Sequence, residues 1–86
     1  MTFSIAARCT ESEEVGVIIA SSSICVASRC AFVRTGVGAA LTQNVTDPSL
    51  GPAVLDAMEQ GNGAVNALAK VISTAHQSRW RQLLAI

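Results

Sequence analysis

The chain has 86 residues, of which half are apolar, and its six basic side chains balance six acidic ones. A chain of this length forms a single domain that buries only roughly 60–65% of its unfolded surface, so its stability margin is thin. The basic residues are dispersed along the sequence, so they form no phosphate-binding patch and we expect no nucleic-acid partner.

The first two predicted elements are strands that form a hairpin. Phe3, Ile5 and Ala7 alternate with more polar residues, which is the period of a half-buried strand. A polar turn over residues 10–14 leads into the β-branched run 15–20, which is typical of a strand that is covered on both faces. We therefore expect these two runs to pair with each other.

Residues 21–31 separate this hairpin from the next one. They begin with three serines and then show neither a helical nor a strand period, so no element is predicted for residues 24–31. Residues 32–35 and 37–42 are short, largely apolar runs on either side of Gly36. This pattern predicts a second hairpin that turns at the glycine.

The sequence then changes to a helical pattern. Pro52 near a helix start and Gly61 just past its end bracket a first helix over residues 53–60. Asn62 is predicted to cap a second helix, which runs from residue 63 to about residue 74 and carries an apolar stripe at helical spacing.

Residues 80–86 predict a fifth strand that is rich in leucine and isoleucine. The order of elements indicates an α+β fold, in which antiparallel strands are followed by two helices and a further strand. An exposed apolar strand needs a neighbour to cover it. We expect residues 1–86 to form a single partial domain, completed by a missing C-terminal portion or by a second chain in a homo- or hetero-oligomer.

The three cysteines form no Cys-x-x-Cys pair and leave one thiol over if two are bridged, which favours a reducing compartment. The longest apolar run is far below the ~20 residues of a membrane helix, and no signal peptide is visible, so we expect a cytoplasmic protein without a membrane partner. The single histidine, His76, cannot make a zinc site, and the Gly-x-Gly of residues 36–38 lacks a third glycine. We therefore expect no metal and no cofactor.

Several short strings resemble a known family in their order and spacing. They are Met-Thr-Phe-Ser-Ile (residues 1–5), the Gly-Val-rich run 15–21, Arg-Thr-Gly-Val-Gly-Ala (34–39), Thr42-Gln43, Gly51-Pro52 and Arg81-Gln82. Over essentially its whole length the chain resembles the N-terminal part of a bacterial domain-of-unknown-function family, number 1028, which is grouped by fold with the N-terminal nucleophile (Ntn) hydrolases. The resemblance implies a partial αββα sandwich, with two antiparallel sheets flanked by helices, within a longer full domain.

The resemblance also implies that Thr2, at the start of the first strand, is the catalytic nucleophile. Once Met1 is removed, the hydroxyl of Thr2 attacks an amide carbonyl and its own α-amine accepts the proton. An α-amine has an ordinary pKa of about 7.7–8, which suits a general base near neutral pH. We therefore expect an Ntn-type amidohydrolase that acts on a small amide, peptide or cyclic amide.

The remaining site residues are expected at strand ends near the nucleophile. An oxyanion hole needs hydrogen-bond donors, for which the end of the second strand and the turn 36–38 are candidates. A guanidinium can stabilise negative charge or hold a substrate carboxylate, and polar residues that leave the fourth strand can orient the amide. The candidates for substrate binding are Ser21, Ser22, Arg34, Thr42, Gln43 and Asn44.

Alternatives to a Thr2 nucleophile stay open. While Met1 is attached, Thr2 has no free amine, and the nucleophile could instead head a second chain that is released by self-cleavage after Ile86. Cys9 or Cys25 could also act as a nucleophile, although most simply the cysteines are small buried residues. Finally, the chain could be a non-catalytic Ntn-like scaffold subunit for assembly or small-ligand binding, because a fold does not guarantee a reaction.

Overall fold

The computed structural model describes residues 1–44, 46–76 and 78–86, and these form an α+β domain with antiparallel strands. The elements in chain order are β1 (Thr2–Arg8), β2 (Val15–Ser21), α1 (Ala27–Cys30), β3 (Ala31–Arg34), β4 (Gly38–Gln43), α2 (Leu50–Glu59), α3 (Ala64–Ile72), a 3₁₀ turn (Ser78–Trp80) and β5 (Gln82–Ala85). Both predicted hairpins, both predicted helices and the final strand are present.

The strands form two separate sheets. The first sheet is the antiparallel hairpin of β1 and β2, in which Thr2 lies opposite Ser21. The second sheet has the order β3-β4-β5, and its pairing places Gln43 of β4 opposite Gln82 of β5. β1 is therefore an edge strand of the first sheet, and β5 is an edge strand of the second.

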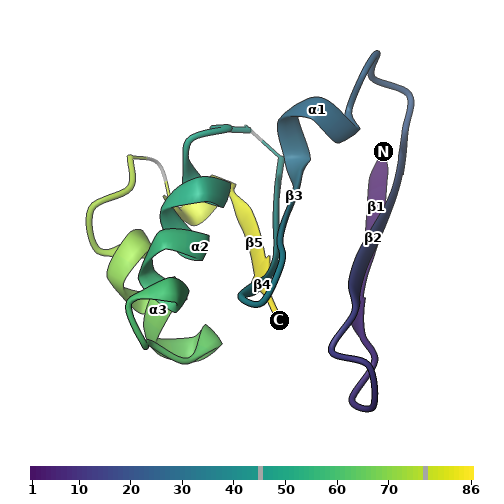
Figure 1. Cartoon of the computed structure of the whole chain (residues 1–86). Helices are drawn as coiled ribbons and strands as arrows, with labels where there is room; N and C mark the ends of the chain where they lie inside the picture. The colour runs from purple at the N-terminus through teal and green to yellow at the C-terminus, as the bar shows by residue number, and fades with distance from the viewer. Residues whose placement is uncertain (45, 77) are drawn as a thin grey trace.

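The domain has three layers, which Figure 1 shows side by side as the hairpin, the second sheet and the pair of long helices. α2 and α3 pack on one face of the second sheet, and the hairpin packs over β3 and β4 on its other face. The hydrophobic core lies under the two helices and comprises Ala40, Leu50, Val54, Leu55, Ala57, Ala67 and Val71. This core holds α2 and α3 against β4.

The two faces of the hairpin have unequal surroundings. The inner face, which we define as the face toward the second sheet, is half-buried and carries Thr2 and Ser4. On the outer face Phe3, Ile5 and Ile18 are 62%, 56% and 69% exposed. The prediction that both faces of β2 are covered is therefore wrong for the described chain, because α2 and α3 lie on the far side of the second sheet.

α2 starts three residues before its predicted boundary because Asp47 organises the preceding turn. One carboxylate oxygen, Oδ1, accepts hydrogen bonds from the backbone N–H of Ser49 at 3.0 Å and from its hydroxyl at 2.6 Å. Pro52 is then the third helical residue, and its missing N–H is one of the first four, which have no partner within a helix. Gly61 follows α2 with a φ of +104°, as the predicted helix end requires.

Asn62 does not cap α3, which corrects the sequence prediction. The N-cap residue is Gly63, which makes no side-chain cap hydrogen bond. The amide nitrogen of Asn62 instead donates to the backbone carbonyl of Ala57 at 2.8 Å. Asn62 thus closes the C-terminal end of α2, where helix carbonyls have no partner in the following turn.

Three further details differ from the sequence expectations. Residues 27–30 form the short helix α1, for which no element was predicted, and Cys30 is buried while Cys9 and Cys25 are exposed. β5 begins at Gln82 rather than at residue 80, because the preceding residues form a 3₁₀ turn in which Trp80 is 65% exposed. Among the described residues, no helix is long and apolar enough to span a bilayer.

Gly51 is the glycine where α2 comes closest to the second sheet, since a Cβ built at this position would overlap the ring of Phe32. Gly51→Ala should lower the free energy of unfolding by about 1–3 kcal/mol, although alanine favours helices, because the overlap forces the ring or the helix to move. Urea unfolding measures this change. Gly16→Ala, which meets no atom within 4 Å, is the matched control and should change stability by less than about 0.5 kcal/mol.

Asp47 should make part of the stability pH-dependent. Its hydrogen bonds with the side chain and backbone of Ser49 lower the pKa of the carboxyl below its ordinary value. A lowered folded-state pKa contributes stability that is present above the unfolded pKa of about 3.9 and is lost as the pH falls through the folded value. Urea unfolding should therefore show wild type more stable than Asp47→Asn at pH 6, with the difference shrinking below pH 4. A difference that stays constant down to pH 2.5 would contradict this.

Candidate functional site

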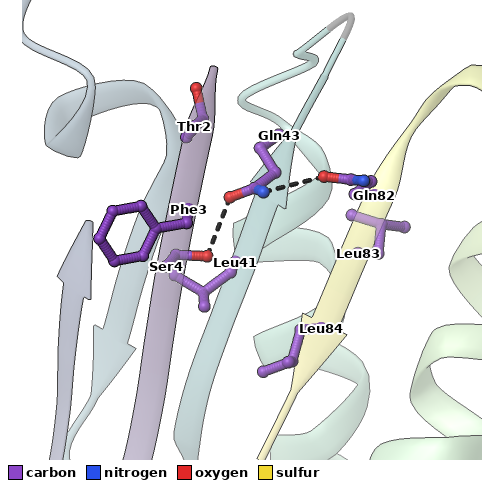
Figure 2. A pocket seen from close by; sticks show the side chains of 8 residues that line it. All are labelled: Thr2, Phe3, Ser4, Leu41, Gln43, Gln82, Leu83 and Leu84. Carbon is purple, nitrogen blue, oxygen red and sulfur yellow. Dashed lines mark hydrogen bonds between the residues drawn. The ribbon is translucent and has the colours of Figure 1, made fainter. Parts of the chain in front are cut away.

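A cleft of about 370 Å³ opens where β1 meets the uncovered part of the second sheet. The hairpin packs over β3 and β4, so the face of β5 beside the edge of β1 stays open and Leu84 is 45% exposed. Figure 2 shows the residues that line the cleft from β1, β4 and β5: Thr2, Phe3, Ser4, Leu41, Gln43, Gln82, Leu83 and Leu84.

The hydroxyl of Thr2 lies at the rim of this cleft and is held by Ser21. The two side-chain oxygens are 2.7 Å apart, because the register of the hairpin places these residues opposite each other on its inner face. The oxygen of Ser21 also accepts a hydrogen bond from the backbone N–H of Ser23 at 3.1 Å. A hydroxyl in this position can accept the proton of Thr2 in a hydrogen bond and so fix the direction of its oxygen lone pairs.

A row of three polar side chains crosses the cleft beside Thr2. The hydroxyl of Ser4 donates to the amide oxygen of Gln43 at 2.9 Å, and the amide nitrogen of Gln43 donates to the amide oxygen of Gln82 at 2.8 Å. Figure 2 shows the row running from β1 across β4 to β5. Because Ser4 follows Thr2 by two residues on the same face of β1, their Cα atoms lie roughly 7 Å apart.

Asn44 lies on the other side of Thr2. A second hollow of about 310 Å³ is lined by Met1, Thr2, Asn44 and Gln82. Asn44 has a φ of +61°, a left-handed conformation that asparagine tolerates better than most residues, and it leaves the end of β4 here. Ser22 is exposed next to Ser21 and lines neither hollow. The structure thus brings Thr2, Ser21, Gln43 and Asn44 to one end of the two sheets.

Arg34 lies away from this end, in contact with α2. Its guanidinium donates to Asp56 at 2.7 Å and to Glu59 at 3.2 Å, and the hydrogen bond with Asp56 raises the pKa of Arg34 above its ordinary value. In the pairing of β3 with β4, Arg34 lies opposite Gly38. Gly38 precedes Gln43 by five residues along β4, so the Cα atoms of Gly38 and Gln43 are roughly 17 Å apart. In this structure Arg34 ties β3 to α2 and does not line the cleft.

Thr42 faces the helices and not the cleft. Its side chain is completely buried, and successive residues of a strand point to opposite faces, so Thr42 shares a face with Ala40 of the core. Its Oγ1 has no hydrogen-bond partner among the described residues. The neighbouring residues Leu41 and Gln43 are therefore the side chains that β4 contributes to the cleft.

The glycine turn of residues 36–38 lies at the opposite end of the sheets from Thr2. A hydrogen bond of 3.2 Å from the guanidinium of Arg8, the last residue of β1, to the carbonyl of Val37 marks this end. The turn therefore cannot supply the oxyanion donors that the sequence suggested for Thr2. Of the two expected sources of donors, only Ser21 and Ser22 lie near Thr2.

Cys9 also lies at that far end, in the turn after β1. A hydrogen bond with the side chain of Ser12 lowers the pKa of the Cys9 thiol, and a hydrogen bond with the backbone of Ser12 lowers it by a smaller amount. Cys9 and Cys25 are exposed, and neither lines the cleft. Among the described residues, no group of three histidine, cysteine, aspartate or glutamate side chains could hold a metal ion.

Two residues of the site, Ser4 and Gln82, were missed by sequence reasoning. The two-residue period of β1 is the signal that could have found Ser4, because it places this residue on the same face as Thr2. Gln82 is different, because its position follows from the pairing of β4 with β5, and the sequence does not fix which residues of two distant strands lie opposite each other.

Comparison with known proteins shows that a model described as a family of unknown function (DUF1028) matches residues 2–86. No curated protein and no solved structure matches the chain. The match confirms that the chain resembles the family that its short sequence strings suggested. Because the family's description names no activity, the chemistry has to be argued from the site itself.

Proposed function

The chain belongs to the DUF1028 family, and we propose that it is an Ntn-type amidohydrolase that acts on a small amide, peptide or cyclic amide through Thr2. In this proposal the hairpin, the second sheet and the helices are three layers of a four-layer αββα sandwich. The observation that supports it best is the hydroxyl of Thr2, held 2.7 Å from that of Ser21 at the rim of a cleft.

The proposed reaction begins when a peptidase removes Met1, which is fully exposed. The freed α-amine of Thr2 takes the proton of the Thr2 hydroxyl while the oxygen attacks the carbonyl carbon of the amide. The tetrahedral intermediate collapses, the C–N bond breaks, and the ammonium group returns the proton to the leaving nitrogen. A water molecule then hydrolyses the ester by the same proton route and restores the threonine.

The polar side chains of the cleft have distinct tasks in this proposal. Ser21 orients the hydroxyl of Thr2 and is the nearer of the two serines to a developing oxyanion, since Ser22 lines neither hollow. Gln43 and Asn44 orient the scissile amide from the end of β4. Arg34 and Thr42 take no part, since one contacts α2 and the other is buried toward the core.

Thr2→Ala should abolish amide hydrolysis by the chain from which Met1 has been removed, with a loss of about 10³-fold or more. Thr2→Ser should keep measurable activity because it retains the hydroxyl. Release of amine or ammonia from a panel of small neutral amides measures the rate. Intact-mass spectra before and after treatment with an amide-mimicking electrophile show whether Met1 is lost and whether Thr2 is labelled.

Thr10→Ala is the matched control, because Thr10 is an exposed threonine in the turn after β1 and lines neither hollow near Thr2. This variant should keep wild-type activity and labelling. Wild-type rates for Thr2→Ala would mean that another residue is the nucleophile. An unreactive Thr2 in a chain that hydrolyses no amide after clean removal of Met1 would leave a scaffold role or a nucleophile on another chain.

A second candidate function is a non-catalytic scaffold subunit for assembly, which the outer face of the hairpin favours. On this face Ile5 lies opposite Ile18, and Phe3 lies opposite Ala20, so three large apolar side chains form a continuous exposed patch. Such patches are typical of interaction surfaces in soluble proteins. We propose that a second chain or a further portion of the polypeptide covers it and adds the fourth layer.

Ile18→Thr should weaken self-association of the chain, because it removes apolar area from this patch and keeps a β-branched residue in β2. Its free energy of unfolding should change by less than about 0.5 kcal/mol, since Ile18 is 69% exposed. Size-exclusion chromatography with light scattering over a concentration series measures the change. Val65→Thr, at a residue of α3 that is 80% exposed, is the control and should leave association unchanged.

A further inference from the structure

The row of hydrogen bonds across the cleft has a direction. The hydroxyl of Ser4 donates a hydrogen bond to the amide oxygen of Gln43, and the amide nitrogen of Gln43 donates a hydrogen bond to the amide oxygen of Gln82. The amide nitrogen of Gln82 is the end of the row, and it makes no hydrogen bond within the part of the chain that the structure describes. In Figure 2 this nitrogen lies on the side of Gln82 that faces away from Gln43.

This direction determines what the cleft can recognise. Each amide oxygen of the row already accepts one hydrogen bond, whereas the amide nitrogen of Gln82 has no partner among the described residues, so the end of the row presents N–H donors that suit a ligand with an acceptor. If both amides were turned round, Ser4 would accept and Gln82 would present an oxygen to a donor ligand. The two arrangements therefore select ligands of opposite hydrogen-bonding character.

The rest of the lining makes a charged ligand unfavourable. Among the described residues, both hollows beside Thr2 are lined only by uncharged side chains, and the smaller hollow also lies against Met1, which carries the N-terminal ammonium group. While Met1 is attached, an ammonium group in either hollow, or a carboxylate in the larger cleft away from the N-terminus, would lose water without meeting an opposite charge, which is costly. Leu41 and Leu84 lie opposite each other across β4 and β5 and give the cleft an apolar floor.

We propose that Gln82 positions a neutral carboxamide substrate by donating from its amide nitrogen to the carbonyl oxygen, while a short branched apolar group of the substrate rests on Leu84, which is 45% exposed. Ser4 acts through Gln43 as the residue that sets the direction of the row. The inference rests on the proposed function only in that Thr2 acts on the amide so bound. The cleft volume of about 370 Å³ lies at the small end of the range for ligand pockets.

Three isosteric probes test the binding part in the Thr2→Ala chain, which cannot turn them over. They are isobutyramide, isobutyrate and isobutyramidinium, which present a neutral amide, an anion that only accepts and a cation that only donates. Titration followed by ¹H–¹⁵N spectra of the side-chain NH₂ group of Gln82 should show isobutyramide binding at least about tenfold more tightly than either charged probe. Tighter binding of isobutyramidinium, tighter binding of isobutyrate, or no shift of the Gln82 signals would each overturn the proposal.

Gln82→Glu tests the positioning role, because it keeps an oxygen for the amide of Gln43 and removes the donor. It should lower kcat/KM for a hydrolysed neutral amide at least about tenfold, because the carbonyl oxygen that Gln82 holds becomes the oxyanion when Thr2 attacks, and it should bind isobutyramidinium more tightly. Gln82→Met should lower kcat/KM in the same way without the gain for the cation. Gln60→Glu adds the same charge at the end of α2 and should match wild type.

These measurements separate the inference from the proposed function. Binding of isobutyramide at Gln82 in a chain that hydrolyses no amide would overturn the hydrolase and support the recognition site. Hydrolysis of amides with a wild-type kcat/KM in both Gln82→Glu and Gln82→Met would support the hydrolase and overturn the role of Gln82.

Discussion

The hydrogen bond from Ser4 to Gln43 joins the two sheets at the point on which the site depends. A two-stranded hairpin is only marginally stable by itself in water, so β1 keeps its position through contacts of its inner face with the second sheet. Thr2 is two residues from Ser4 on this face, and the placement of its hydroxyl relative to Gln43 and Gln82 follows from that contact. A slip of β1 by one residue in its pairing with β2 would turn its inner side chains outward and dismantle the cleft.

The inner face of the hairpin divides along its length. At one end Thr2, Ser4 and Ser21 are polar and belong to the site, although Ile19 lies opposite Ser4 on the same face. Farther along, Ala6 and Val17 are small or apolar. Apolar residues at the polar end would bury more surface and hold the sheets together more strongly. Polar groups that cost stability at a cleft are a common feature of functional sites, and here they coincide with the proposed nucleophile.

Local sequence patterns predicted the helices and strands. They did not predict which residues of distant strands lie opposite each other. The two-residue period and Gly36 were enough for both hairpins, and Gly61 was enough for the end of α2. The start of α2 differed because Asp47 captures Ser49 before the apolar period begins. For the site, Thr2 followed from a family resemblance and Gln43 from its place at a strand end. Gln82 depends on the register of β5 against β4, which no local pattern contains.

The two candidate functions depend on the same strand and need not compete. Phe3 and Ile5 on the outer face of β1 alternate with Thr2 and Ser4 on its inner face, so a layer that packed on the outer face would also fix the backbone that carries the site. Catalytic groups have to be held within about 0.5 Å of their working geometry. An edge strand covered on one face only is poorly suited to this. Assembly through the outer face would therefore complete the rigidity that Thr2 needs as a nucleophile, and the exposed patch becomes a requirement of the proposed chemistry as well as a surface for a partner.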